Sequence, residues 1–341
     1  MRDKCILPFL ITERLEFFQL TQADLPELEI LLGDTEIMYA WEHGFTKIES
    51  QAWLNENLRR YSSDGYSYWA VRKKNDGSLI GVMGILKEVA EGKQYIGIGY
   101  ILNKKYWGQG YAGEGTEALC QYAFRKLQLQ TLTAQVRTNN FASQHIAEGL
   151  GMKAMCNFVK IYRGQEMPHF LYTLDRDKWL KTASNGTVIM LELEAKKRFF
   201  TIITAGDEDE KMLDRYLKRG DLFALYKGDL KATVVVTQEK EDVFEVKNLA
   251  VWPQEQRRGY GRFLMTEMCR LYSRLGTRML VGTGDVFETL NFYQACGFTR
   301  SHVIKNFFTD NYPQPIFENG IQLKDMVYLE CFLKNDRRLK K

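Results

Sequence analysis

The feature that most constrains this chain is a glycine loop that occurs twice, 149 residues apart. Residues 107–113 read WGQGYAG and residues 256–261 read QRRGYG, so that Gly110 matches Gly259. Each loop follows an apolar, strand-like stretch and precedes a stretch with apolar residues at helical spacing. A repeat of this length far exceeds the roughly 20–50 residues of a solenoid unit. It predicts two domains of one fold in tandem.

Both copies fit one plan of alternating strands and helices. The first copy predicts strands over 14–20, 66–74, 78–87 and 95–102, and helices over 21–33, 49–62 and 114–127. The second copy predicts a strand over 199–205, a helix over 208–220 and strands over 221–228, 231–239 and 244–251, without a second helix in its N-terminal half. The polar, small-residue segment 180–188 is typical of a boundary. We therefore expect an N-terminal domain over 8–180 and a C-terminal domain over 188–335.

The glycines of the first loop also have the spacing of a dinucleotide-binding fingerprint, Gly108-x-Gly110-x-x-Gly113. That site needs an acidic residue about 20 positions further on, to bind the ribose. No Asp or Glu lies between Glu117 and Glu148, so we reject NAD. A glycine loop at a helix N-terminus still favours a phosphate or pyrophosphate, because backbone N–H groups and the helix dipole attract anions.

Composition excludes several other classes of function. A net charge of +4 gives no case for a nucleic-acid partner. Six cysteines and four histidines are scattered without the spacing of a metal site, so we expect no metal and free thiols. The N-terminal apolar stretch is too short for a signal peptide or a membrane span. These patterns favour a cytoplasmic protein without a membrane partner.

The two loops resemble the pyrophosphate loop of the GNAT superfamily of acetyl-CoA-dependent N-acetyltransferases, Arg/Gln-x-x-Gly-x-Gly/Ala. QRRGYG matches this pattern fully, and WGQGYA departs from it only at Trp107. The resemblance covers nearly the whole chain. It implies an α/β (α+β) fold class, with two tandem GNAT folds, each a mixed, mostly antiparallel central sheet with helices on both faces. It also implies acetyl-CoA as the co-substrate.

The resemblance assigns coenzyme-binding residues in both copies. In the first copy these are Tyr100, Leu102, Trp107, Gly108, Gln109, Gly110, Tyr111, Ala112 and Asn140. In the second copy they are Leu249, Ala250, Val251, Gln256, Arg257, Arg258, Gly259, Tyr260, Gly261, Arg262 and Asn291. The strand residues are expected to offer backbone N–H groups to the thioester carbonyl and pantetheine, and the loops to bind the pyrophosphate.

The first copy resembles the branch of this superfamily that acetylates the N-termini of ribosomal proteins, through GYILNKKYWGQGYAGEG and Asn140-x-x-Ser143. That branch carries an acidic residue directly before its Ile-Gly-Tyr triplet, where this chain has Gly97. The candidate general base is therefore missing, although Ser143 remains a candidate acid. We expect this domain to be catalytically weak or purely structural.

The second copy keeps more of the chemistry that the resemblance implies. Glu245 is placed like a base that deprotonates the amine; the alternative is a solvated strand carboxylate. Tyr293 is placed like a tyrosine that protonates the coenzyme A sulfur; the alternative is a core aromatic. The polar tail 307–330 resembles a subgroup of small bacterial acetyltransferases. Its Glu318 and Asp325 are candidates to face a cationic amine, or alternatively to anchor the loop.

Together these features predict an N-acetyltransferase that transfers acetyl from acetyl-CoA to a primary amine, either a small molecule or a peptide N-terminus. The chemistry is expected mainly in the C-terminal domain. The alternative is an acyl-CoA-binding pseudoenzyme that acts as a sensor or a protein-interaction module. An oligomer is not required, because two tandem domains can form a pseudo-dimer.

Overall fold

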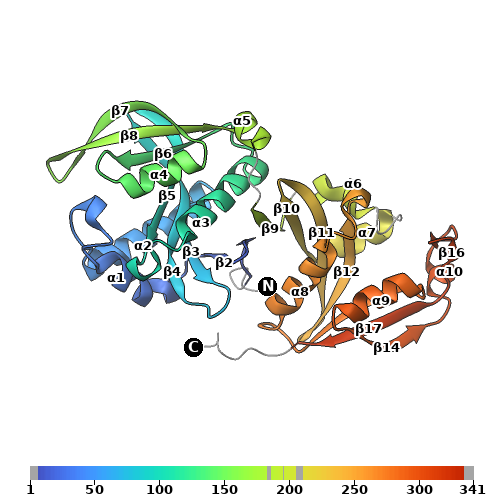
Figure 1. Ribbon diagram of the computed structural model, residues 1–341. Helices are drawn as coiled ribbons and strands as arrows, with labels where there is room; N and C mark the ends of the chain where they lie inside the picture. The colour runs from blue at the N-terminus through green and yellow to red at the C-terminus, as the bar shows by residue number, and fades with distance from the viewer. Residues whose placement is uncertain (1–6, 183–185, 195, 205–209, 334–341) are drawn as a thin grey trace. The chain divides into compact units, whose positions relative to one another are not determined.

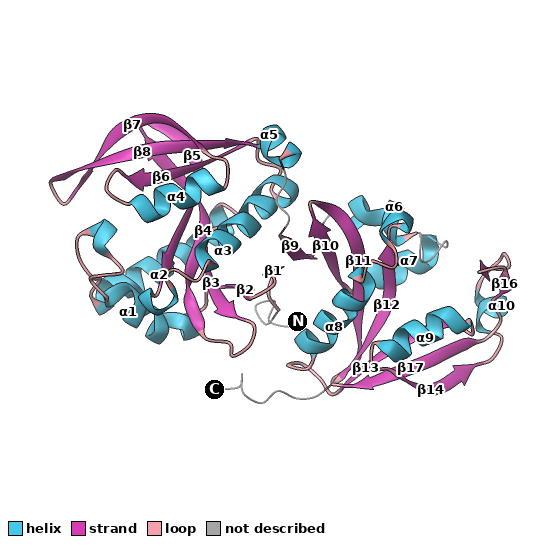
Figure 2. Ribbon diagram, viewed as in Figure 1, coloured by secondary structure: helices cyan, strands magenta, loops and turns pink. Residues whose placement is uncertain are grey.

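The computed structural model describes residues 7–182, 186–194, 196–204 and 210–333. The chain divides after Val188 into two compact units, which we call the first and the second unit. Each unit has a central, mostly antiparallel sheet with helices packed against it (Figures 1 and 2). The predicted fold class, two tandem domains with mixed sheets and helices, is confirmed.

The sheet of the first unit has the strand order β1-β2-β3-β4-β5-β6-β8-β7. Every recorded pair of neighbours is antiparallel except β5 with β6, which run parallel. Parallel neighbours need a crossover connection, and the helix after the first glycine loop supplies it. The strands are β1 Leu10–Ile11, β2 Leu15–Gln19, β3 Tyr68–Lys73, β4 Leu79–Ala90, β5 Lys93–Leu102, β6 Thr131–Arg137, β7 Lys153–Tyr162 and β8 Gln165–Asp175.

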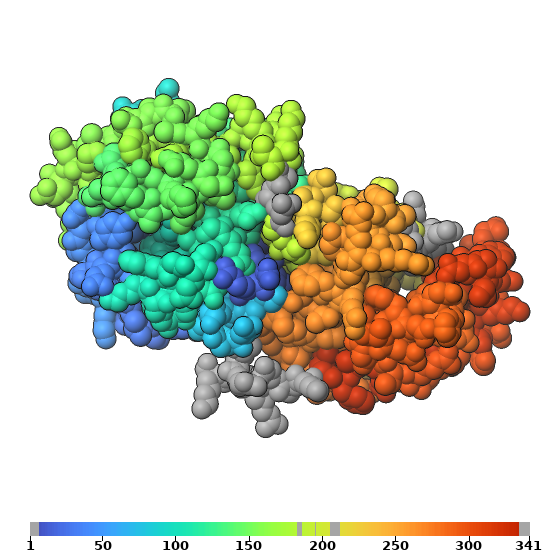
Figure 3. Space-filling view, in the orientation of Figure 1, coloured from blue at the N-terminus to red at the C-terminus, as the bar shows by residue number. Residues whose placement is uncertain are grey.

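Helices of the first unit hold β5 in place. Leu28 and Leu31 of α1 and Leu54 of α2 pack with Val82 of β4 and Ile101 of β5 in one buried cluster. In the space-filling view the half that contains β6 to β8, in green, lies above the half that contains α1 and α2, in blue (Figure 3). The helices are α1 Leu25–Gly33, α2 Lys47–Ser63, α3 Tyr111–Gln121, which continues as a π-helical turn over Tyr122–Lys126, α4 Phe141–Gly149 and α5 Arg176–Lys181.

The second unit repeats this plan with the strand order β9-β10-β11-β12-β13-β17-β14. Here β12 and β13 are the parallel pair, and the other recorded pairs are antiparallel. A separate two-stranded hairpin, β15 Phe317–Glu318 with β16 Ile321–Gln322, lies in the C-terminal tail. The sheet strands are β9 Thr187–Glu192, β10 Asp221–Lys227, β11 Asp229–Lys240, β12 Val243–Val251, β13 Arg278–Gly284, β14 Thr299–Ile304 and β17 Met326–Phe332.

The start of the second unit differs from the prediction. The strand expected over 199–205 is wrong, because Phe200–Ile203 forms the helix α6. The first strand is β9, which begins at Thr187, inside the segment 180–188 that was interpreted as the boundary, and continues to Glu192. The expected absence of a second helix is also wrong, since α7 Glu210–Leu217 follows α6. The other helices of this unit are α8 Tyr260–Tyr272, α9 Phe287–Ala295 and α10 Phe307–Asn311. Residues 183–185, 195, 205–209 and 334–335, which the predictions included, lie outside the described residues.

Candidate functional site

In the first unit, the parallel strands β5 and β6 diverge and open a cleft between them. Among the described residues their ladder is recorded at one position, Gly97 opposite Thr133. Beyond that position β5 runs on to Leu102 and β6 to Arg137. Beyond that pair, the facing edges of the two strands are not paired with each other, so their backbone N–H and C=O groups can bind another extended group.

The glycine loop follows β5 and leads directly into α3. Gly108 and Gly110 have φ values of 70° and 78°, in the left-handed region that glycine adopts without strain. Gly110 is the N-cap of α3, so the first-turn N–H groups of that helix point toward the loop without an intrahelical partner. Trp107 secures the start of the loop, because its Nε1 donates to the Leu102 carbonyl at 2.8 Å. The arrangement is suited to bind an anion.

A cavity of about 1330 Å³ lies in this cleft, somewhat above the roughly 300–1,000 Å³ of ordinary ligand pockets. Its walls come from the end of β5, the glycine loop, α4, β7 and the segment around Tyr39. Of the residues that the sequence assigned to the first copy, the following line the cavity: Tyr100, Leu102, Trp107, Gly108, Gly110, Tyr111, Ala112, Asn140 and Ser143. Gln109 does not line it; its Nε2 donates to the Lys105 carbonyl at 2.8 Å.

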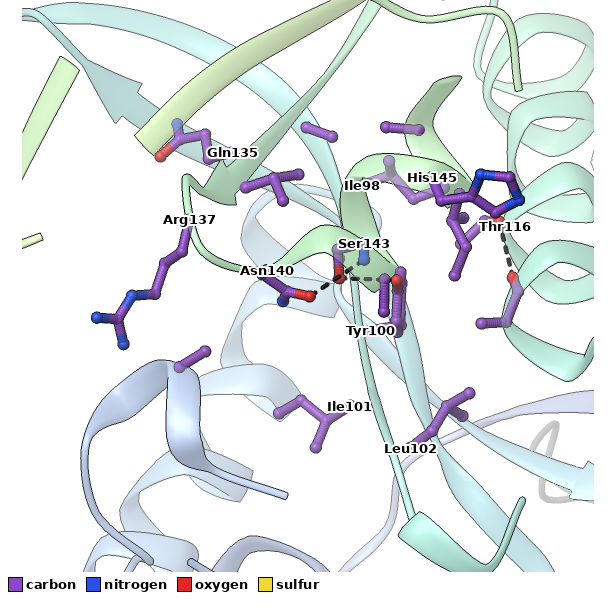
Figure 4. Close-up of a pocket in the computed structure, with 18 of the residues that line it drawn as sticks. Ile98, Tyr100, Ile101, Leu102, Thr116, Gln135, Arg137, Asn140, Ser143 and His145 are labelled. Carbon is purple, nitrogen blue, oxygen red and sulfur yellow. Dashed lines mark hydrogen bonds between the residues drawn. The ribbon is translucent and has the colours of Figure 1, made fainter. Parts of the chain in front are cut away.

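Ser143 is positioned in the cavity by two neighbours (Figure 4). The Asn140 side chain caps α4 by accepting a hydrogen bond from the Ser143 N–H at 3.1 Å. The Tyr100 and Ser143 hydroxyl oxygens are 2.9 Å apart, within hydrogen-bonding distance. Burial raises the pKa of Tyr100 to about 12, so this hydroxyl keeps its proton at neutral pH. The pair can donate a proton to a group bound between β5 and α4.

The second unit repeats this divergence of its parallel strands, β12 and β13. The two strands pair from Val243 opposite Arg278 to Val246 opposite Val281, and no pairing between them is recorded beyond that point. Leu249, Ala250 and Val251, which the sequence assigned to the coenzyme, all lie on this diverged end of β12. The sequence-predicted strand segment thus lies beyond the last recorded pair of the two parallel strands.

The second glycine loop has the backbone conformation of the first. Arg257 and Gly259 have φ values of 59° and 87°, at positions that the repeat matches to Gly108 and Gly110. Gly259 is the N-cap of α8, which begins at Tyr260. The two positive φ angles therefore recur in both units, although one of the four positions carries a side chain.

Three of the charged and polar side chains around the second loop have partners within the protein, and one has none recorded among the described residues. Arg258 forms an ion pair with Glu255 at 3.1 Å, and Arg262 donates to the Ala295 carbonyl at 2.9 Å. Gln256 donates to the Val251 carbonyl at 3.4 Å. For Arg257, no side-chain partner is recorded within the part of the chain that the structure describes. Arg257 is exposed, two residues before the N-cap Gly259 of α8.

Glu245 lies on β12, one residue before the last position that pairs with β13. Its side chain is buried, at 6% exposure, which excludes the solvated strand carboxylate that the sequence left open. The Tyr328 hydroxyl donates to Glu245 at 3.2 Å, and Lys247 Nζ lies 2.7 Å from the same carboxylate. Burial, followed by the nearby Glu245 charge, raises the pKa of Tyr328, which the sequence reasoning did not single out.

Tyr293 lies on α9 with its ring between two aromatic neighbours. The ring centroids of Phe292 and Phe298 are 5.1 and 6.1 Å from that of Tyr293. Burial raises the pKa of the Tyr293 hydroxyl, so it is protonated at neutral pH and can serve only as a donor of that proton. Asn291, two residues earlier, is exposed.

The two acidic residues of the C-terminal tail bind groups of this unit. Glu318 accepts a hydrogen bond from the Thr289 hydroxyl. Asp325 pairs with Lys305 at 2.6 Å and accepts from the Asn306 N–H at 2.9 Å. These contacts favour the anchoring role that the sequence left open beside substrate binding.

The residues that the structure describes contain neither a membrane-spanning helix nor a metal-binding group of side chains. No helix there is long and apolar enough to cross a membrane. No group of three or more His, Cys, Asp or Glu side chains is placed to hold a metal ion.

Comparisons with known proteins match both units. One family model, described as an acetyltransferase (GNAT) domain, matches residues 14–153, and another of the same description matches 218–300. The chain is 32% identical over 144 residues to the uncharacterized N-acetyltransferase YvbK of Bacillus subtilis (strain 168), covering 41% of this chain and 93% of that protein. It is 30% identical over 164 residues to the uncharacterized protein YkkB of the same organism, covering 48% and 93%. A solved GNAT family acetyltransferase from Elizabethkingia anophelis with acetyl-CoA bound is 29% identical and covers 44% of this chain and 100% of that chain, with a TM-score of 0.42.

Proposed function

Because this chain belongs to the GNAT acetyltransferase family, with two GNAT domains in tandem, we propose that it transfers an acetyl group from acetyl-CoA to a primary amine. The acceptor is a small molecule or a peptide N-terminus. We assign the main chemistry to the second unit, which has a buried carboxylate, Glu245, and a protonated tyrosine, Tyr293, in addition to the glycine loop.

The observation that carries this proposal is the repeated loop beside a diverging parallel strand pair. Both loops place two left-handed residues directly before a helix whose first N–H groups have no intrahelical partner. The pyrophosphate of acetyl-CoA carries the charge that such a helix end favours. Beyond its last recorded pair with β13, β12 offers backbone groups that suit the amide-containing pantetheine arm. The residues present therefore fit acetyl-CoA as a substrate.

In the second unit, Glu245 is the residue that we propose as the general base. A protonated amine cannot attack a thioester, so the acceptor must first lose a proton. The buried Glu245 carboxylate takes that proton, directly or through one water. The Tyr328 and Lys247 contacts fix its orientation. The amine nitrogen then bonds to the acetyl carbon as the bond from that carbon to sulfur breaks.

Two further groups complete the proposed transfer. Negative charge that develops on the thioester oxygen is stabilised by a backbone N–H from the diverged end of β12, at Leu249, Ala250 or Val251. The departing sulfur takes a proton from the Tyr293 hydroxyl, which burial keeps protonated. After the new bond forms, the nitrogen loses its second proton, and Tyr293 regains from solvent the proton that it gave to the sulfur. The net products are the acetylated amine, coenzyme A as the free thiol, and one proton released to solvent.

The first test replaces Gly259 by Val, because a side chain at φ 87° is strained and projects where the pyrophosphate would bind. We expect Gly259→Val to lower the acetyl-CoA affinity of the second unit at least about tenfold, a loss of about 1.4 kcal/mol, measured by calorimetry. Gly228→Val is the matched control, because Gly228 also has a positive φ, 69°, with open space around it, in the turn between β10 and β11.

Coenzyme A release from acetyl-CoA, measured with a panel of primary amines, tests the reaction itself. Wild-type protein is expected to release coenzyme A together with an acetylated amine identified by mass. Binding of acetyl-CoA without release across the panel would instead favour the acyl-CoA-binding pseudoenzyme. Failure to bind acetyl-CoA at all would contradict both functions.

A further inference from the structure

The floor of the first unit's cleft contains two glycines that admit side chains from neighbouring strands. A Cβ atom added at Gly97 of β5 would lie 2.2 Å from Glu88 Oε2, and one added at Gly99 would lie 2.6 Å from the Tyr68 hydroxyl oxygen. Glu88 belongs to β4 and Tyr68 to β3. The space above each glycine is therefore filled by a polar atom that comes from another strand.

Glu88 lies at the point where the cleft begins. Gly97 is the residue of β5 that pairs with Thr133 of β6, and the two strands diverge after it. The Glu88 carboxylate, directly over Gly97, is therefore at the apex of the divergence. Both Glu88 and Tyr68 line the cavity that also contains Tyr100 and Ser143.

No structural role is evident for this carboxylate. Glu88 Oε2 is buried, and it has no hydrogen-bond partner among the residues that the structure describes. A buried polar atom without a partner costs roughly 1–3 kcal/mol, more when it is charged, so most such groups in native proteins are paired. An unpaired carboxylate that faces a cavity is instead available to a bound ligand.

The second unit shows the same chemical group at the same place. Glu245 lies one residue before the end of the pairing between β12 and β13. The repeat matches Glu245 to Ile96 of β5, so the first unit has no acid on this strand at 96 or 97. Glu88, which lies on β4, places a carboxylate at that apex instead. Both strand divergences thus begin at a carboxylate: Glu245 is buried, and Glu88, on a different strand, is half-buried with its Oε2 buried.

From this geometry, and on the basis of the proposed function, we infer that the first unit is a second acetyl-transferring site in which Glu88 is the general base. Glu88 accepts a proton from a primary amine bound in the cavity. The amine nitrogen bonds to the acetyl carbon as the carbon–sulfur bond breaks, and the sulfur takes a proton from the Ser143 hydroxyl, which is hydrogen-bonded to Tyr100. One proton leaves the amine and one reaches the sulfur, so the transfer balances.

The surroundings of Glu88 suit this role. Burial raises the pKa of Glu88 from its ordinary value of 4.5, and the positive charges of Lys160 on β7 and Arg60 on α2 partly oppose that rise. The Tyr68 hydroxyl on β3, whose own pKa is raised by burial, is neutral at physiological pH and adds no charge. A carboxylate with a raised pKa is a stronger base than an exposed one.

The experiment uses full-length chains with the second unit silenced by Glu245→Gln, so that any remaining transfer comes from the first unit. Coenzyme A release is measured with three probe amines: benzylamine, 1,4-diaminobutane and an alanine-initiated tetrapeptide. We expect residual turnover, and we expect Glu88→Gln added to Glu245→Gln to lower it by at least about 100-fold, as for loss of a general base. Acetyl-CoA affinity should stay unchanged.

Two further variants separate catalysis from structure. Adding Glu88→Ala with Gly97→Glu to the silenced chain returns the carboxylate to β5 in the space that Glu88 vacated, and is expected to restore turnover to within about tenfold. Glu27→Gln, added to the silenced chain, is the control. It removes a carboxylate of the first unit that lies on α1, outside the cavity lining, and pairs with Arg72 at 2.5 Å, and it should leave turnover unchanged.

Each outcome decides between the proposals. No turnover in the Glu245→Gln chain, in the presence of wild-type turnover, overturns the second site and leaves the proposed function standing. Residual turnover that Glu88→Gln does not reduce overturns the role of Glu88. If Glu88→Gln lowers turnover and the chain with Glu88→Ala and Gly97→Glu does not restore it, Glu88 has a structural role. That result also overturns its role as the general base. No turnover in the wild type overturns the proposed function and this inference together.

Discussion

Tyr293 and Phe292 are adjacent aromatic residues of one helix, and Tyr293 is the one that we propose as the acid of the second unit. Tyr293→Phe keeps the ring that packs against Phe298 and removes the oxygen. In a Glu88→Gln chain, which isolates the second unit, we expect kcat to fall by about 10²-fold, since the sulfur must then leave without an acid. The acetyl-CoA dissociation constant, measured by calorimetry, should not change.

The control for this variant is Tyr272→Phe. Tyr272 is another buried tyrosine of the second unit, but its hydroxyl donates to Asp221 at 2.8 Å. Its loss should lower stability without lowering kcat. An unchanged kcat in Tyr293→Phe would remove the acid role and leave Tyr293 as a core aromatic, the alternative reading of the sequence.

The Glu88 side chain is expected to lower the stability of the fold by an amount that depends on pH. Because burial raises its pKa in the folded state, the neutral carboxyl is favoured there, and ionisation at higher pH destabilises the fold. Glu88→Gln removes that charge. We expect the melting temperature of Glu88→Gln to exceed that of the wild type above the folded-state pKa of Glu88. The difference should disappear as pH falls below the unfolded value of about 4.5.

Thermal unfolding of both chains across this pH range measures the effect. Glu148→Gln, whose carboxylate has a hydrogen-bonding partner, should show no gain in melting temperature at neutral pH. A Glu88→Gln chain that is less stable than the wild type at neutral pH would mean that Glu88 has a structural partner. That result would contradict the unpaired carboxylate described above.

At the scale of elements, the second loop carries Arg257 where the first has Gly108. A non-glycine residue at φ 59° costs roughly 1–2 kcal/mol, so Arg257→Gly is expected to maintain or raise the stability of the second unit. The same change removes an exposed guanidinium beside the α8 N-terminus. We expect its acetyl-CoA affinity to fall about tenfold or more, as for loss of one charge-assisted hydrogen bond. Denaturant unfolding and calorimetry measure the two effects separately.

Asn306→Gly is the matched control, because Asn306 also has a positive φ, 56°, and lies at the N-cap of α10. It should share the effect on stability without the effect on affinity. An Arg257→Gly chain that binds acetyl-CoA as tightly as the wild type would show that Arg257 makes no contact with the phosphates.

The strands and helices of the sheet were largely predictable, because their apolar residues follow the periods of 2 and 3.6 residues. The predicted strands over 95–102 and 244–251, for example, correspond to β5 and β12. The strand predicted for the sequence FFTIITA was wrong, because a short apolar run with β-branched residues fits a buried helix as well as a buried strand. Phe199, Ile202 and Ile203 are buried at helical spacing, and only tertiary packing decides between the two periods.

The candidate site was predictable only where it is local in sequence. The loops, Glu245, Tyr293 and Ser143 come from contiguous motifs, so the sequence could nominate them. Glu88 could not be nominated this way, because it meets Gly97 across a strand pair rather than along the chain. The sequence could show that residue 97 lacks a side chain. It could not show which neighbour fills the space.

At the scale of the whole molecule, two cofactor loops of one backbone conformation carry different charges. Arg257 in the second loop is exposed and without a recorded partner among the described residues, while the first loop has Gly108 there. The cations near the first loop have partners: Lys104 pairs with Glu36, Arg14 pairs with Glu114, and Lys105 lies over the Tyr106 ring. Attraction between exposed charges is screened by salt over about 10 Å at 0.1 M ionic strength. Added salt should therefore weaken acetyl-CoA binding in the second unit more than in the first. One chain would then hold two sites whose relative occupancy is set by ionic strength rather than by the supply of acetyl-CoA alone.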